Sequence, residues 1–188
     1  MPNLDGMAEH VAYEVNMLVE TARRLTPPLA DTVTNNAHLE SFLIHARSLD
    51  NFLRPIPKNP QQDDVFAQHF YAKWIGKGSL PDGLRDDVNK RVAHLTDTRV
   101  GEQADVSPAG VARSLLGTFC DFSAQLGAGK WPALDEAEAV ALGYLAVLLD
   151  PLVYPGAFAT TTTSGTVVMV KDFGGYIATA PGGSDHPD

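Results

Sequence analysis

The sequence has 188 residues and a formal net charge of −9, with 44% hydrophobic and 20% charged residues. A chain of this length is most simply one domain that buries a core of its own. Its acidic balance argues against broad binding to a phosphate backbone, which needs many Lys and Arg side chains on one surface. We therefore expect no broad DNA binding.

Cysteine content and hydropathy bear on the compartment. Cys120 is the sole cysteine, and its apolar surroundings favour a buried small hydrophobe over a nucleophile. Asp5 and Glu9 do not fit a signal peptide. The longest apolar run, 139–149, has 11 residues, far fewer than the roughly 20 that span a bilayer. These features predict a cytoplasmic protein without a membrane partner.

The first part of the chain predicts two long helices. Apolar side chains recur at a helical period through residues 4–25, and two prolines end this helix. A second helix is predicted to begin at Asn35 or Asn36, either of which can cap it, and to run to Leu53.

A proline-rich loop and a third helix are predicted next. Three prolines between residues 54 and 62 indicate a loop. Asp63 and Asp64 suit the start of a helix, where carboxylates meet unpaired N–H groups. Three aromatic side chains of this helix would share one side: Phe66, Phe70 and Trp74.

Three further helices complete the predicted fold. One covers about 84–99, the next begins where Ser107 can cap and Pro108 takes the first helical position, and the last fills about 134–149. The pattern predicts an all-α, single-domain bundle of about five to six helices over residues 1–150.

The last segment, 151–188, has a different character. It is rich in Thr, Gly and Pro, and only "VVMV" and "YIATA" resemble strands. Two strands alone are marginal in water, so a flexible, disordered tail is favoured over a hairpin.

Charged side chains interrupt the apolar stripes of two predicted helices. On the helix at 84–99, Arg91 and Arg99 project on or beside the stripe, with His94 one turn from Arg91. Asp50 likewise projects onto the stripe of the second helix. An unpaired buried charge costs several kcal/mol, so we expect Asp50 to pair with Arg91 or Arg99.

Two interpretations of this polar seam stay open. It is either a structural ion pair, with arginine stems lying along the core, or a polar pocket with His45 and His94 at its mouth. A metal site is not favoured, because no HxxxH or ExxH spacing occurs, and no metal or other cofactor is expected. The expected seam residues are His45, Asp50, Asn89 and Arg99.

Three blocks carry a resemblance: "FLIHARSLDNFL", "DDVFAQHFYAKW" and "VNKRVAHLTDTR". In this order, over about residues 39–100, they resemble a group of uncharacterised bacterial helical proteins. More distantly, a helical bundle with Arg and His on a late helix resembles the HEPN superfamily, which implies a metal-independent ribonuclease, usually dimeric, of toxin or phage-defence type. That superfamily places four to six residues between its Arg and His, whereas two residues separate Arg91 from His94.

Two functions are therefore expected from the sequence. The first is a protein-interaction or self-association module, which fits an acidic chain without a complete catalytic motif. The alternative is a HEPN-like nuclease, with RNA as its partner. In that case His94 would be the general acid or base, and Arg91 would stabilise the charged phosphorane.

Overall fold

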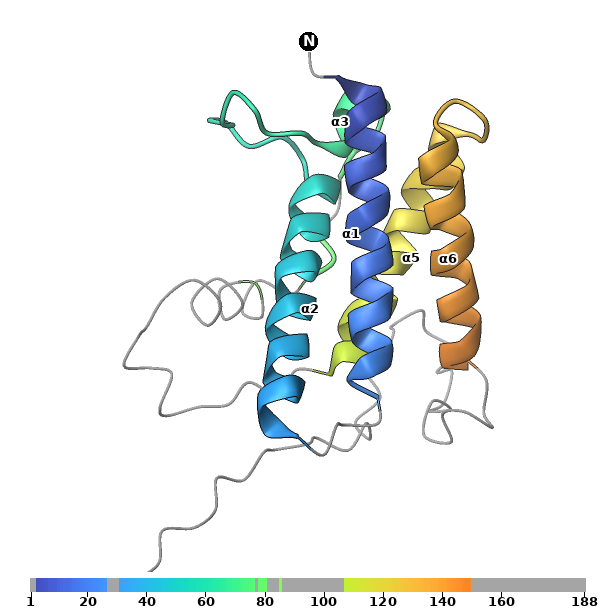
Figure 1. Ribbon diagram of the computed structural model, residues 1–188. Helices are drawn as coiled ribbons and strands as arrows, with labels where there is room; N and C mark the ends of the chain where they lie inside the picture. Colours follow the sequence, from blue (N-terminus) through green and yellow to red (C-terminus); the bar gives the residue numbers. More distant parts are fainter. Residues whose placement is uncertain (1–2, 27–30, 77, 81–84, 86–106, 150–188) are drawn as a thin grey trace, which may run out of the picture.

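The computed structural model describes residues 3–26, 31–76, 78–80, 85 and 107–149. Within these residues every regular element is a helix, which confirms the all-α prediction (Figure 1). The predicted tail at 151–188 lies outside the described residues, as does the helix predicted at 84–99 apart from Arg85. The helices are α1 (Leu4–Arg24), α2 (Thr32–Leu53), α3 (Ala67–Phe70), α5 (Pro108–Leu126) and α6 (Pro132–Leu149).

The four long helices form a bundle. α1 packs against α2 and α6, and α5 packs against α2 and α6 on the other side. α1 and α6 run in one direction, and α2 and α5 run in the other (Figure 1). Each helix turns its apolar side toward the shared core, as the helical period of the sequence predicts.

Two helix starts follow directly from the residues at the caps. The Asn3 side chain accepts a hydrogen bond from the Gly6 N–H at the start of α1. At α5 the Ser107 hydroxyl accepts from the Gly110 N–H, and Pro108 occupies the first turn, as predicted. Both caps satisfy N–H groups that have no partner inside the helix.

The start of α2 was predicted incorrectly. The cap is Asp31 and not an asparagine, because the Asp31 carboxylate accepts from the backbone N–H groups of Val33 and Thr34. The pKa of Asp31 is lowered, first by the Thr34 hydroxyl and then by these N–H groups. A carboxylate at the positive end of the helix is a strong cap, so α2 begins at Thr32.

The third helix is also shorter than predicted. Asp64 does not start it, because its carboxylate accepts from the Gln61 N–H and closes a turn before the helix. Only α3, four residues long, is helical in this segment. The three aromatic side chains predicted to share a side are all buried.

The core near α3 is aromatic. The Phe52 ring meets Phe70 and Phe122 edge to face, with centroids 5.8 and 5.4 Å apart. Trp74 lies against Phe122, and its indole N–H donates to the Leu53 carbonyl at 2.8 Å. Edge-to-face packing and a satisfied indole N–H make this a well-specified core.

Candidate functional site

Asp50 is a fully buried carboxylate with several donors around it. Arg54, the residue that directly follows α2, donates from Nε to Asp50 Oδ2 at 2.6 Å. The backbone N–H groups of Ser79 and Leu80 donate to Oδ1 at 2.9 and 3.0 Å. Charge-assisted bonds of this kind compensate for the loss of water around the carboxylate.

A second arginine approaches the same carboxylate. Arg85 Nε lies 3.7 Å from Asp50 Oδ2, and its Nη2 donates to the Asn51 side chain at 2.9 Å. Arg54 also donates from Nη2 to the Leu80 carbonyl. A Cβ at Gly78 would overlap the Arg54 guanidinium, so a larger residue there would have to displace that group from Asp50 and the Leu80 carbonyl.

Asp50 is thus buried and paired with arginine, as its place on the apolar stripe indicated. The arginines around it in the described chain are Arg54 and Arg85, whereas Arg91 and Arg99 lie outside the described residues. The contacts tie the loop at 78–80 to α2. Both carboxylate oxygens of Asp50 accept hydrogen bonds within the fold, which favours the structural interpretation of the seam.

The proposed nuclease residues are not part of the described chain. Arg91 and His94 fall in the range 86–106, together with the predicted seam residues Asn89 and Arg99. The nuclease alternative therefore stays a prediction from the sequence.

His45 belongs to a different contact from Asp50. Its ring is buried between α2 and α1, where Nδ1 lies 2.8 Å from Glu14 Oε2 and the Tyr13 ring meets it edge to face. Five residues along a helix correspond to about 140 degrees of rotation, so His45 and Asp50 face different neighbours. The described residues do not bring His45 and Asp50 into one seam.

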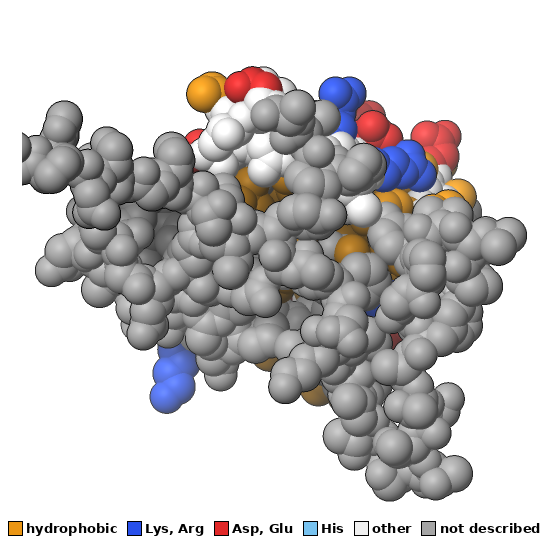
Figure 2. Space-filling model, turned by 90° about the horizontal axis from the view of Figure 1, so that it is seen from below, with side chains coloured by type: hydrophobic (Ala, Val, Ile, Leu, Met, Phe, Trp, Pro, Cys, Tyr) orange, Lys and Arg blue, Asp and Glu red, His pale blue; other side chains and the backbone are white. Residues whose placement is uncertain are grey.

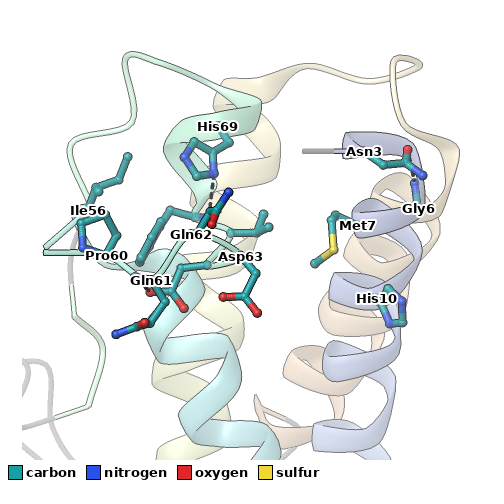
Figure 3. A pocket seen from close by; sticks show the side chains of 13 residues that line it. Asn3, Gly6, Met7, His10, Ile56, Pro60, Gln61, Gln62, Asp63 and His69 are labelled. Carbon is teal, nitrogen blue, oxygen red and sulfur yellow. Dashed lines mark hydrogen bonds between the residues drawn. The ribbon is translucent and has the colours of Figure 1, made fainter. Parts of the chain in front are cut away.

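A hollow of about 790 Å³ opens beside the first turns of α1 (Figure 3). Met7 and His10 line it from α1, and Asp63 and His69 line it from the opposite side. The sequence reasoning missed this hollow, because its walls come from residues 3–10 and 56–69 and share no motif.

Two polar side chains of the hollow take part in the local fold. His69 Nδ1 accepts from the Phe66 N–H, and the Asp64 carboxylate accepts from the Gln61 N–H. In the described part of the chain, no group of three His, Cys, Asp or Glu side chains is placed to hold a metal ion. The His69 and Asp64 contacts belong to the helix start and the turn that form one wall of the hollow.

The outer face of α6 is apolar. The outer face of α6 is defined here by six exposed residues: Ala139, Leu142, Gly143, Ala146, Val147 and Leu149. The three large side chains among them expose 51%, 42% and 59% of their surface. On the opposite side of the helix, Ala141, Tyr144 and Leu148 are buried in the bundle.

A surface helix normally carries charged residues on its outer side, and the second half of α6 does not. Residues 140–149 contain no Asp, Glu, Lys or Arg. α1, by contrast, places Glu20 and Arg23 outside, where they form an ion pair at 2.9 Å. Figure 2 looks onto the end of the bundle where both helices finish, and charged side chains of both signs stand on its rim.

Cys120 lies on α5 beside α6 and is half-buried. Burial raises its pKa to about 11, with further contributions from Glu138 and Asp121. Glu138 also accepts a hydrogen bond from the Ser123 hydroxyl at 2.8 Å. A thiol that keeps its proton is a poor nucleophile, which agrees with its interpretation as a small hydrophobe.

Comparison with other proteins adds no assignment. The chain matches no protein-family model, and no curated protein or solved structure is similar enough to count as a match. Among the described helices, none is long and apolar enough to cross a membrane. The resemblances drawn from the sequence blocks stay predictions.

Proposed function

We propose that this protein is an interaction module that associates with itself through the outer face of α6. The observation that supports it is the apolar character of that face, where Leu142, Val147 and Leu149 are exposed. Contiguous apolar surface of this kind is typical of protein–protein contacts. Within the described chain, no other element covers the face.

The chain's charge supports a contact at this place. Two copies that each carry a net charge of −9 repel one another. The surface formed by 139–149 carries no charged side chain, so copies can meet there with little local repulsion. The face is formed by a single helix, so we expect a weak, reversible contact with a dissociation constant on the order of micromolar.

The test is sedimentation of the purified protein over about a hundredfold dilution, which should show a reversible monomer–dimer equilibrium. Leu142→Glu would place a charge in the contact and should raise the dissociation constant about thirtyfold or more, the scale of a central contact residue.

The matched control is Ile44→Glu on α2. Ile44 exposes 47% of its surface, close to the 51% of Leu142, but it lies on another helix. It should leave the equilibrium unchanged. A protein that stays monomeric at every concentration, or a dimer that Ile44→Glu weakens as much as Leu142→Glu, would contradict the proposal.

A further inference from the structure

The arrangement of residues along α6 points to how two copies meet. We infer that the outer faces pair antiparallel across a two-fold axis near residue 144, with Arg113 of each copy beside Glu136 of the other. This inference rests on the proposed self-association and adds the direction of the contact and the residues that determine it.

The first argument is shape. Leu142 and Leu149 lie along one side of the face, and Ala139 and Ala146 lie beside them. A two-fold axis at the level of residue 144 places a residue that lies before 144 in one copy opposite the residue equally far after 144 in the other. Residue 142 then meets 146, and residue 139 meets 149. Each leucine then lies beside an alanine of the other copy. Large side chains beside small ones let helices approach closely.

The second argument is charge. Asp135 lies in the first turn of α6, and Glu136 beside it is exposed, so this end of the helix is acidic. Arg113 of α5 lies at the other end, where its Nη2 donates to the Leu148 carbonyl at 3.1 Å. An antiparallel pair brings the acidic end of one copy to the arginine end of the other. A parallel pair would set Glu136 against its own copy.

Engineered cysteines test the direction. In a Cys120→Ala background, single cysteines replace residues of the outer face and are treated with a short thiol cross-linker. Ala146→Cys should cross-link to its own copy. Ala139→Cys should not, because its two copies lie about 15 Å apart along the axis, at 1.5 Å of rise per residue.

A mixture of two variants makes the test specific. Ala139→Cys mixed with Leu149→Cys should yield a cross-link between the two chains. If Ala139→Cys instead cross-links to itself as readily as Ala146→Cys, the copies are parallel, and the inference fails while self-association stands. If the protein dimerises without any of these cross-links, the face is not the contact, and both proposals fail.

Charge reversal tests the pair between Arg113 and Glu136. Glu136→Arg should raise the dissociation constant about five- to tenfold, because an exposed ion pair contributes modestly and the two-fold axis repeats it. Adding Arg113→Glu in the same chain should restore most of the affinity. Circular dichroism checks that this double variant is folded. A folded double variant that binds no better than Glu136→Arg alone would overturn the assignment of this pair.

Discussion

Two regions of the molecule place side chains against the usual preference for apolar residues inside and charges outside. On α2, Asp50 is a carboxylate buried in the core. On α6, Leu142 and Leu149 are large apolar side chains at the surface. The two departures differ in what surrounds them.

Asp50 finds its partners inside the chain. Two arginines and two backbone N–H groups surround its carboxylate. The outer face of α6 finds no covering element within the described residues. A buried carboxylate whose hydrogen bonds are all made within the chain is explained by its role in the fold. Apolar surface that no element of the chain covers is typical of a contact with a partner. The comparison therefore assigns Asp50 to stability and supports the proposal that α6 takes part in association.

The largest expected effect is on the free energy of unfolding, and it tests the structural role of Asp50. Asp50→Ala should lower the free energy of unfolding by roughly 3–5 kcal/mol, because it leaves an arginine and two N–H groups without their acceptor. Leu142→Glu should change it by less than about 0.5 kcal/mol in dilute protein, where the copies are separate. Urea unfolding measures both values. A cost below about 1 kcal/mol for Asp50→Ala would remove the contrast between the two regions.

A smaller effect on the free energy of unfolding distinguishes the two arginines around Asp50. The Arg54 side chain is 21% exposed and donates at 2.6 Å, whereas Arg85 is 37% exposed and stands at 3.7 Å. Arg54→Met should cost roughly 2 kcal/mol and Arg85→Met less than about 1 kcal/mol, because exposure weakens an ion pair.

Combining each change with Asp50→Ala in a double-mutant cycle isolates the pairwise energy, since only residues in contact depart from additivity. Equal coupling energies for the two arginines would show that the guanidinium of Arg85 contributes as much as that of Arg54. In that case the distances would be a poor guide to the energetics of this site.

Much of the fold follows from the sequence, because helical periods and caps act locally. The cap formed by Ser107 and Pro108 and the extents of α1 and α6 were predicted on this basis. The start of α2 was wrong because Asp31 competes with the asparagines after it, and a carboxylate that accepts two N–H groups defines the earlier start.

The sites were harder to predict, because their contacts join distant segments. The position of Asp50 on the apolar stripe predicted a buried ion pair. Arg54, four residues later, has the spacing of a helical ion pair, but the prolines beside it made this position look like a loop. The approach of Arg85 and of the Ser79 N–H could not be seen without the fold. On α6 the apolar outer face is already visible in the sequence, as a run of apolar residues without the charged residues that an exposed helix normally carries.

The smallest expected effect concerns Cys120, a half-buried titratable group beside which the described chain places two carboxylates, Glu138 and Asp121. Its pKa is raised from 9.0 to about 11, mainly by burial and then by the nearby Glu138 and Asp121 carboxylates. The unfolded thiol loses its proton near pH 9, while the folded one keeps it. The stability that Cys120 contributes is therefore complete below pH 9 and is lost as the pH rises toward 11.

Alkylation of the native protein should accordingly be slow at pH 8 and should accelerate as the pH approaches 11. Glu138→Gln should shift the midpoint of this profile downward, because it removes a negative charge beside the thiol. Protein unfolded in urea gives the reference rate. A native thiol that reacts at pH 8 as fast as the unfolded one would show that burial beside α6 does not protect it. The contact between α5 and α6 would then be looser than the packing of the bundle implies.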